Sequence, residues 1–454
     1  MCRTLFFVFV AITIDIIFGS LYLWNKTFFD MRRLCFFVVA LLALTACERP
    51  SAKVESVVAY TRVGDINNVM IDAIELTVAD AASLRGLKAE DFDIVNNIPD
   101  GFVDPATGAA PVPYEDDGIV LTRKKNTLRI EAKSFNYRGR RGQNRQMEGW
   151  QLICKVDPNL NVTAENVTES RLAVLDDCVK GEFTYAGITR EYILHLPKDA
   201  EGNVKKNVPL LVWQIGGGEY NRDLMTAAMA NRCIVSLPDA GVECATLMFA
   251  IANPNYSYSA SLDEERIKLV DRNNALQMAF IDTLIADGIV DGSKLFCAGA
   301  SSGGGCTMRF MMQFPDRFKA AIPCCAMDPI VPIHKVEERY DGQFMDDLVK
   351  AFQDKVYKWN GEDMALAPID TEAFCRLPMF FVHADSDTTC KVISSHVYFG
   401  ARERLGAKND KIQIYDDAYM QSFGIPKMIS HFSWVPLLND YSEGTAMDWL
   451  VKQM

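Results

Sequence analysis

The stretch that decides the fold covers residues 294–313 and reads KLFCAGASSGGGCTMRFMMQ. A short apolar run breaks at a serine flanked by glycines and continues as an amphipathic run rich in methionine, which predicts a strand, a sharp turn and a helix. Residues 299–303 fit the pattern G-x-S-x-G, in which a strained turn exposes the serine hydroxyl above a sheet. The bare pattern is a weak signal, but the strand before it and the helix after it are the context it requires. We therefore predict a nucleophile elbow, with a plain glycine-rich turn as the alternative.

The register of the pattern selects the nucleophile. Ser302 would need a glycine two residues earlier, where the chain has Ala300, so the predicted nucleophile is Ser301. Ser302 then supplies the backbone N–H directly after the nucleophile, which is half of the oxyanion hole in this architecture.

A glycine run supplies a candidate for the other half of the oxyanion hole. The apolar strand predicted at residues 208–215 runs into Gly216, Gly217, Gly218 and Glu219, where this architecture places a second N–H. Only glycine lets the backbone approach a substrate oxygen so closely, and we predict Gly217 for this role. The histidine that usually precedes such a loop is missing and Ile215 stands there, so a plain glycine turn is the alternative.

The acid and the base are predicted from chain order, which must be serine, aspartate, histidine. A buried strand at residues 377–383 runs into two candidate acids, Asp385 and Asp387, at the rim where the nucleophile sits. Of five histidines, His396 and His431 follow these acids; His396 lies in a helical run, whereas His431 lies in a loop before the last helix. We predict His431 as the base and Asp387 as the acid, with Asp385 as the runner-up.

The composition is that of a globular protein. The chain has 454 residues, of which 49% are apolar and 23% charged, enough for a large core and two domains. The formal net charge of −12 argues against a nucleic-acid partner. The basic cluster at residues 138–145 is short and interrupted by glycine, as is typical of a solvated loop.

The N-terminus carries two apolar stretches, at residues 5–24 and 34–46. The second follows Arg32 and Arg33 and ends in small residues before Cys47, which is the pattern of a secretory signal. It resembles a bacterial lipoprotein signal, and the resemblance implies cleavage before Cys47 and lipid on that cysteine.

On this interpretation Met31 is the true start and residues 1–46 form a leader. The alternative is a membrane helix at residues 5–24, which is long enough to span a bilayer but contains Asp15. Either interpretation places the folded part in the cell envelope outside the cytoplasm, periplasmic or at the cell surface.

The cysteines outside the leader are even in number. Of thirteen, two fall in the leader and one is Cys47, which leaves ten in a compartment that permits disulfides. None has the spacing to histidine of a metal site, so we expect no metal and take buried thiols or disulfides as the default.

The pattern of the chain changes near Gly181. Before it, short alternating runs such as VMIDAIELTV at residues 69–78 are broken by Gly, Pro, Asn and Asp, as in a β-sandwich. After it, strand and helix patterns alternate, which predicts an α/β domain with a mainly parallel sheet. We predict a sandwich domain at residues 47–180 that is structural or binding, and a catalytic domain at residues 181–454.

Together these motifs resemble the α/β-hydrolase esterases of the polyhydroxybutyrate depolymerase and feruloyl esterase type, over residues 183–454. In that family the acid stands four residues after a strand-end histidine, as Asp387 follows His383. The family's catalytic histidine is followed three residues later by a tryptophan, as His431 is by Trp434. Residues 51–180 resemble, less specifically, the immunoglobulin-like N-terminal domain of some bacterial esterases of this group.

Three functions compete. The resemblance implies a serine carboxylic ester hydrolase without a cofactor, acting through an acyl-enzyme on short-chain or carbohydrate-linked esters, with pocket candidates Tyr256, Tyr258 and Trp434. A serine peptidase of the prolyl-oligopeptidase type would use the same catalytic residues, but the blade repeats of its propeller, of about forty residues each, are not found. The third hypothesis is a non-catalytic carbohydrate-binding or adhesion lipoprotein. The presence of a candidate nucleophile, base and acid in the required chain order argues against it.

Overall fold

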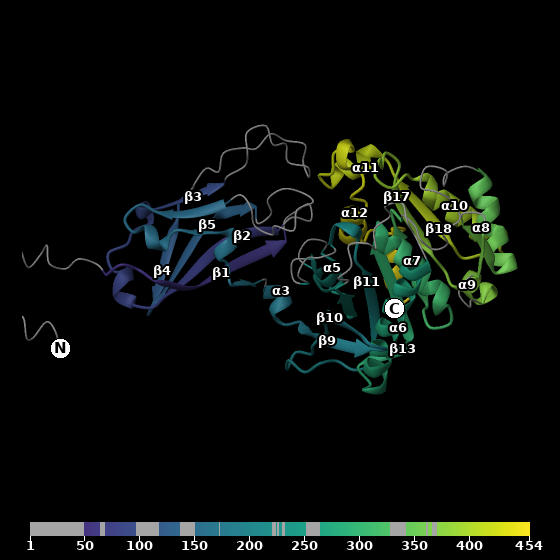
Figure 1. The fold of residues 1–454 in the computed structure, drawn as a ribbon, viewed down its shortest axis with the longest axis horizontal. Coiled ribbons are helices and arrows are strands. Elements are labelled where there is room, and N and C mark those ends of the chain that lie inside the picture. The colour runs from purple at the N-terminus through teal and green to yellow at the C-terminus, as the bar shows by residue number, and fades with distance from the viewer. Residues whose placement is uncertain are drawn as a thin grey trace, which may run out of the picture.

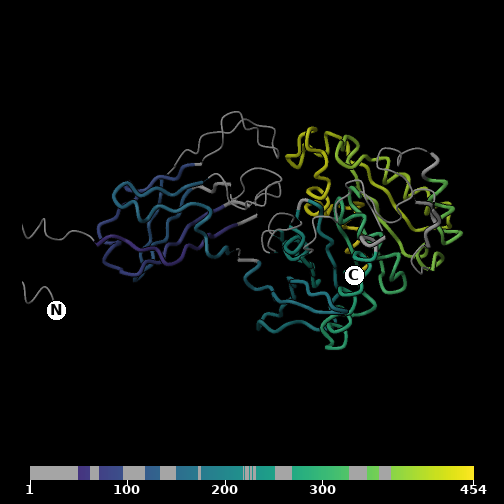
Figure 2. The backbone as a smooth tube through the Cα atoms, viewed as in Figure 1, coloured from purple at the N-terminus to yellow at the C-terminus, as the bar shows by residue number. Residues whose placement is uncertain are grey.

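The computed structural model describes residues 50–63, 69–96, 118–136, 150–171, 173–219, 224, 227–228, 232–250, 264–326, 342–359, 362–365 and 370–454. The predicted leader, Cys47 and the pocket candidates Tyr256 and Tyr258 lie outside these ranges. A β-rich N-terminal body and a larger α/β body lie side by side (Figure 1), and the chain passes between them once in the described part (Figure 2).

The described residues of the N-terminal body form two sheets. The first has the order β4-β5-β2-β1-β8, with β1 and β8 parallel and the other neighbours antiparallel. Its strands are β1 (Val54–Val63), β2 (Val69–Val78), β4 (Val120–Lys124), β5 (Thr127–Asn136) and β8 (Glu169–Arg171). The second has the order β3-β6-β7, formed by β3 (Phe92–Asn96), β6 (Trp150–Cys154) and β7 (Val162–Thr163). The turns between strands include η1 (Ala81–Leu84), η2 (Ala89–Asp91), η3 (Pro158–Leu160) and η4 (Ala164–Asn166).

Alternating strand residues from both N-terminal sheets share one apolar core. Ile74 and Leu76 of β2 belong to the same buried cluster as Trp150 and Leu152 of β6. The period of two that the sequence shows therefore places one face of each sheet inward. The predicted β-rich character of this region is confirmed, and its immunoglobulin-like topology stays a prediction.

The chain leaves the N-terminal sheet and enters the α/β sheet between Arg171 and Val179. β8 ends the N-terminal sheet at Arg171, the short helix α3 (Ala173–Asp176) follows, and β9 (Val179–Tyr185) already belongs to the sheet of the α/β body.

The α/β body is built on one sheet with the order β18-β17-β14-β13-β11-β12-β10-β9. Every neighbouring pair from β12 to β18 is parallel, whereas β10 runs antiparallel to both β12 and β9. The remaining strands are β10 (Ile188–His195), β11 (Val208–Gln214), β12 (Ala245–Phe249), β13 (Val290–Ala300), β14 (Ala320–Cys324), β17 (Phe380–Ala384) and β18 (Lys411–Tyr415). This confirms the predicted α/β domain with a mainly parallel sheet.

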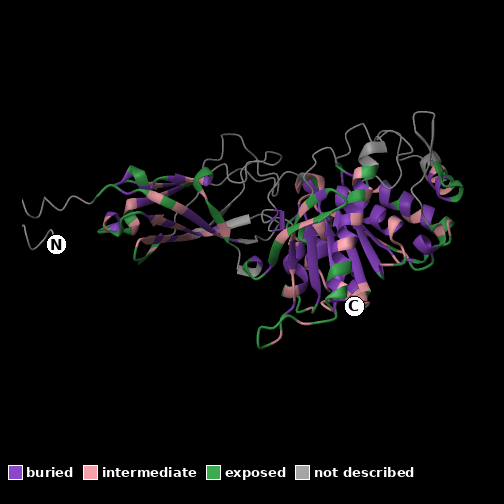
Figure 3. Ribbon diagram, turned by 60° about the horizontal axis from the view of Figure 1, so that its bottom comes forward, coloured by how far each residue is buried: buried purple, intermediate pink, exposed green. Residues whose placement is uncertain are grey.

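Both faces of this sheet are buried. Leu211 and Trp213 of β11 belong to one apolar cluster, and Leu210 and Val212 of the same strand to another, as a period of two requires. The first cluster includes residues of α5 (Cys233–Asp239), α11 (Asp417–Ser422), α12 (Trp434–Asn439) and α13 (Ala446–Val451). The second includes residues of α6 (Glu264–Ala286), α8 (Gly342–Asp354), α9 (Thr371–Arg376) and α10 (Ile393–Arg404). Helix α7 (Ser302–Gln313) contributes to both. In Figure 3 the strands of this sheet are mostly purple, the colour of buried residues.

The remaining elements are the hairpin β15 (Val356–Trp359) and β16 (Glu362–Ala365) and the short helices η5 (Gly217–Glu219) and η8 (Lys427–Ile429). Within the described ranges, no helix has the length and apolar character that crossing a bilayer requires. The ten cysteines after Cys47 are all buried thiols.

Candidate active site

The predicted strand, turn and helix are present around Ser301. Strand β13 ends at Ala300 and helix α7 begins at Ser302, so Ser301 alone makes the turn, with φ 59° and ψ −123°. A non-glycine residue in such a conformation costs of order 1–3 kcal/mol and needs support from its surroundings. Here the Ser301 N–H donates to the Cys324 carbonyl at 3.0 Å, which ties the turn to β14. The hydroxyl is thereby held at the carboxyl ends of the strands.

The glycines around Ser301 allow the close approach of three backbone segments. A Cβ on Gly303 would lie 2.1 Å from the Gln214 carbonyl oxygen, at the end of β11. A Cβ on Gly299 would lie 2.6 Å from the Gly303 carbonyl oxygen. The first turn of α7 therefore rests directly on the end of β11, which brings the loop after β11 beside the serine.

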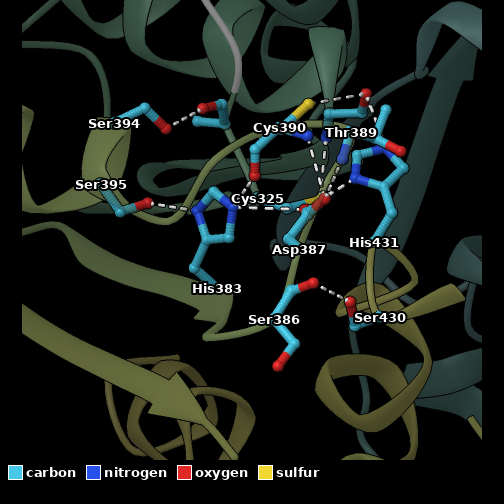
Figure 4. Close-up of polar contacts among 12 residues, drawn as sticks. Cys325, His383, Ser386, Asp387, Thr389, Cys390, Ser394, Ser395, Ser430 and His431 are labelled. Carbon is cyan, nitrogen blue, oxygen red and sulfur yellow. Dashed lines mark hydrogen bonds and ion pairs between the residues drawn. The ribbon is translucent and has the colours of Figure 1, made fainter. Parts of the chain in front are cut away.

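His431 lies within hydrogen-bond distance of Ser301. Its Nε2 is 3.1 Å from Ser301 Oγ, and its Nδ1 is 2.8 Å from Asp387 Oδ2. The next residue but two, Trp434, packs edge-on against the imidazole, with ring centroids 5.4 Å apart. Ser430 Oγ donates to the Ser386 carbonyl at 2.5 Å, which joins the histidine loop to the aspartate loop (Figure 4).

Asp387 is buried and fully hydrogen-bonded. Its Oδ1 accepts the backbone N–H groups of Thr389 at 2.8 Å and Cys390 at 2.9 Å, while Oδ2 faces His431. Burial alone would raise the pKa of Asp387, but the hydrogen bonds from His383 and His431 hold it well below its usual value. The side chain is therefore a carboxylate, and its contact with Nδ1 selects the His431 tautomer that leaves Nε2 free to accept a proton.

Asp385, the runner-up acid, is placed differently. It is exposed, and its N–H continues the sheet by donating to the Tyr415 carbonyl at 2.9 Å. The structure thus brings Asp387, and not Asp385, to His431. The other candidate base, His396, lies in α10. The imidazole within hydrogen-bond distance of Ser301 Oγ is that of His431.

His383, four residues before Asp387, has a role at the site that the sequence did not predict. The side chain is fully buried at the end of β17, with Nε2 2.6 Å from the Cys390 carbonyl and 3.3 Å from Asp387 Oδ2. Because Nε2 faces two acceptors, it carries a hydrogen, and Nδ1 accepts from Ser395 Oγ at 2.8 Å. His383 therefore positions the aspartate loop (Figure 4).

Two cysteines at the centre were also missed. Cys325 follows β14 with φ 36°, and its Sγ lies 3.3 Å from the Ser301 nitrogen. Cys390 Sγ lies 3.7 Å from Ser301 Oγ. The sequence carries no signal for either contact, because both depend on how β14 and the loop after β17 pass the elbow.

The candidate oxyanion-hole residues flank the serine. Ser302 is the first residue of α7, so its N–H has no acceptor within the helix. In the glycine loop, the Gly216 N–H donates to Glu219 Oε2 at 2.8 Å, and a Cβ on Gly216 would lie 3.8 Å from Ser301 Cβ. Gly217 comes next and opens η5.

Known proteins resemble the chain in sequence over part of its length and in fold over most of it. Residues 269–419, less than half of the 454-residue chain, match the prolyl oligopeptidase family; this part includes Ser301 and Asp387 but not His431. None of the curated protein sequences matches the chain significantly. The solved structure of a thermostable esterase is similar, with 19% identity and a TM-score of 0.55, over 88% of this chain and 99% of that one.

Two further solved structures are more distant. Est1E from Butyrivibrio proteoclasticus has 15% identity and a TM-score of 0.36, over 60% of this chain and 98% of that one. The Pyrococcus horikoshii acylaminoacyl peptidase has 15% identity and a TM-score of 0.34, over 60% of this chain and 44% of that one. The family match and the likeness to the thermostable esterase together support an α/β-hydrolase fold for the C-terminal domain. With the family match, the Ser301, His431 and Asp387 arrangement marks the chain as an enzyme of the serine hydrolase type.

Proposed function

We propose that this protein is a carboxylic ester hydrolase in which Ser301, His431 and Asp387 form the catalytic triad. The main support for this proposal is a chain of two hydrogen bonds. The first joins Ser301 Oγ to His431 Nε2 at 3.1 Å, and the second joins His431 Nδ1 to Asp387 Oδ2 at 2.8 Å. The three side chains come from separate segments in the order serine, aspartate, histidine, which is the order for this fold. Both distances lie within hydrogen-bond reach, as a nucleophile, its base and the group that orients the base require.

In the first half-reaction, Ser301 Oγ attacks the ester carbonyl carbon while His431 Nε2 takes the hydroxyl proton. The Asp387 carboxylate stabilises the imidazolium that forms and keeps Nδ1 protonated. His431 then gives the proton to the departing alkoxide, which leaves the acyl group on Ser301. In the second half-reaction, His431 takes a proton from water while the water oxygen attacks the acyl carbon. His431 then gives this proton to Ser301 Oγ as the bond from Oγ to the acyl carbon breaks and the carboxylic acid leaves.

The negative oxygen of each tetrahedral intermediate needs donors on the side away from His431. We assign this role to the N–H groups of Ser302 and Gly217. Ser302 lies at the N-terminus of α7, where the helix dipole also favours negative charge. The Gly216 N–H already donates to Glu219, which leaves the next N–H of the loop, that of Gly217, as the donor the proposal uses.

The substrate in this proposal is a short-chain or carbohydrate-linked ester, and Trp434 is a candidate for its pocket. Trp434 is half-buried and packs edge-on against His431, so its indole lies beside the proposed base. Aromatic side chains in such positions stack on sugar or aryl groups.

A peptidase is the second candidate, favoured by the match of residues 269–419 to the prolyl oligopeptidase family. The described N-terminal strands, however, form sheets of five and three strands. These differ from the four-stranded blades of a propeller.

The two candidates differ in the bond they break, so a matched substrate panel separates them. The panel contains p-nitrophenyl esters of increasing acyl length, acetylated and feruloylated sugars, and peptidyl p-nitroanilides, each tested with wild type and Ser301→Ala. We expect kcat/KM for the best ester to exceed that for every anilide, and Ser301→Ala to remove both activities. Preferential cleavage of an anilide would favour the peptidase. Failure of the folded protein to hydrolyse any member would favour the non-catalytic binding protein.

A further inference from the structure

Three side chains with metal-ligating atoms lie close together at the serine centre, by which we mean Ser301 and the residues around its hydroxyl. Cys325, Asp387 and His431 each offer one such atom, these atoms all lie within 4.8 Å of one another, and all three residues are buried. A thiolate, an imidazole and a carboxylate together suit Zn²⁺ and related thiophilic divalent ions, whose bonds to these ligands are about 2.0 to 2.3 Å long. Two of the three are the proposed base and acid, so a bound ion would compete with catalysis directly.

The position of the Cys325 thiol depends on an unusual backbone. Cys325 has φ 36°, in the left-handed region that a non-glycine residue adopts only at a cost. The conformation is held by the Cys325 N–H, which donates to the Val382 carbonyl at 2.7 Å. In this conformation Cys325 Sγ lies 3.3 Å from the Ser301 nitrogen, beside the elbow. Strain of this kind concentrates at functional sites, and here it brings a thiol to a mechanism that does not use one.

We propose that the serine centre binds a thiophilic divalent cation of the zinc class through Cys325, His431 and Asp387, and that binding switches the hydrolase off. The inhibitory part rests on the proposed function, whereas the binding part does not.

The charges of the three ligands suit a divalent ion. A thiolate, a carboxylate and a neutral imidazole balance a charge of +2, so the filled site would be neutral, which reduces the cost of burying the ion. Asp387 is already a carboxylate. Cys325 must lose its proton to the solvent when its sulfur binds the ion, and a coordinated metal drives this deprotonation. The step needs no oxidant or reductant.

Binding would stop catalysis through either nitrogen of His431. If the ion takes Nδ1, the hydrogen bond to Asp387 is lost; if it takes Nε2, the nitrogen that accepts the Ser301 proton is blocked. In both cases the imidazole no longer links the serine to the carboxylate. Because the three protein ligands leave a tetrahedral ion one open position, a chelator can approach and remove it.

The test uses the full-length protein after chelator treatment and measures binding separately from activity. Cd²⁺ is titrated while the ultraviolet thiolate-to-cadmium charge-transfer band is followed, and Zn²⁺ inhibition of ester hydrolysis is measured relative to each variant's own metal-free rate. For wild type we expect one ion per chain, the charge-transfer band, and inhibition that a chelator reverses. Cys325→Ser should lose the band and bind at least about 100-fold more weakly, because even outer contacts of a metal site are worth 10 to 100-fold.

Two further variants are controls. Cys375→Ser removes another buried thiol, on α9, and should keep the wild-type band and affinity. Ser301→Ala removes the proposed nucleophile but none of the ligands, so it should bind Cd²⁺ like wild type. Cd²⁺ binding by Ser301→Ala therefore tests the metal site even if the protein is not a hydrolase.

The proposal is overturned if Cys325→Ser binds Cd²⁺ with wild-type affinity, or if wild type binds without a thiolate band. Wild-type binding without inhibition of turnover would overturn the inhibitory part. Should Cys325→Ser fail to fold, Asp387→Asn replaces it as the ligand variant. We expect Asp387→Asn to bind at least about 10-fold more weakly, and unchanged affinity would count against the site in the same way.

Discussion

Asp385 and Asp387 are separated by one residue, yet only one of them is built into the centre. Asp387 receives two backbone N–H groups and contacts two histidines, whereas Asp385 is exposed. The sequence preferred Asp387 but left the other open, because a strand-end loop can present either side chain to the rim. The choice depends on the backbone path of residues 387–390, which local pattern does not determine.

The first prediction ranks the triad by substitution. Ser301→Ala and His431→Ala should each remove nearly all turnover, because the two act as a unit. Asp387→Asn should lower kcat by about 10³ to 10⁴, since the imidazole loses its tautomer and its charge partner. Asp385→Asn should change kcat only a few-fold. Steady-state kinetics with a p-nitrophenyl ester measure this, with circular dichroism as the folding control. If the two aspartate variants exchanged their effects, the assignment of the acid would be wrong.

The second prediction concerns stability at acid pH. The pKa of Asp387 in the folded protein lies below its ordinary value of 3.8, because of its two histidine partners. Its ionised form therefore stabilises the fold above the unfolded-state pKa, and this contribution is lost as the pH falls from about 4 toward the folded pKa. The free energy of unfolding of wild type should fall more steeply between about pH 5 and pH 3 than that of Asp387→Asn. Asp385→Asn is the control and should follow wild type; equal slopes for wild type and Asp387→Asn would refute the linkage.

At the scale of elements, the elbow is the part of the site that the sequence predicts best. The glycine pattern, the preceding strand and the following helix are all local, and the structure has each of them within a few residues of its predicted bounds. His383, Cys325 and Cys390 reach the centre only because β14 pairs with β13 on one side and β17 on the other. Their roles depend on non-local pairing, so a reading of consecutive residues misses them.

The third prediction tests the contact between α7 and β11. Gly303→Ala would place a methyl group 2.1 Å from the Gln214 carbonyl oxygen, where neither backbone can yield easily. We expect the free energy of unfolding of Gly303→Ala to be lower than that of wild type by about 3 kcal/mol or more. We also expect a lower kcat/KM, because the loop at residues 216–218 follows the end of β11 and would move with it. The matched control is Gly292→Ala, whose methyl group would lie 3.2 Å from Ile285 Cδ1, the end of a side chain that can rotate away. We expect this variant to lose about 1 kcal/mol or less in free energy of unfolding. Denaturant unfolding measures both; equal stability of the two variants would show that the contact is not tight.

At the scale of the whole molecule, the α/β body was easier to predict than the N-terminal body. Buried parallel strands alternating with helices leave long, distinct patterns in the sequence, whereas the N-terminal strands are short and pair over long distances. Val58 of β1, for example, pairs with Glu169 of β8. Alternation predicts strands there, but it does not predict which strands become neighbours.

The fourth prediction concerns the anchor. We propose that Cys47 is the mature N-terminus and carries lipid, which would place the hydrolase on a membrane surface in the cell envelope. Mass spectrometry of the membrane fraction should find the lipidated N-terminal peptide, and Cys47→Ser should move the protein out of that fraction. An unmodified peptide that crosses positions 46 and 47 in most of the protein would rule the anchor out.

If Ser301 is the activated nucleophile of a serine hydrolase, a reagent that reacts with activated serines should label it covalently. The purified protein is treated with a fluorophosphonate and the adduct is mapped by mass spectrometry, with Ser302→Ala as the neighbouring control. We predict one phosphonyl group per chain on Ser301, unchanged labelling of Ser302→Ala, and no labelling of correctly folded Ser301→Ala. An adduct on another residue, or a folded wild-type protein that stays unlabelled, would show that Ser301 is not the activated nucleophile.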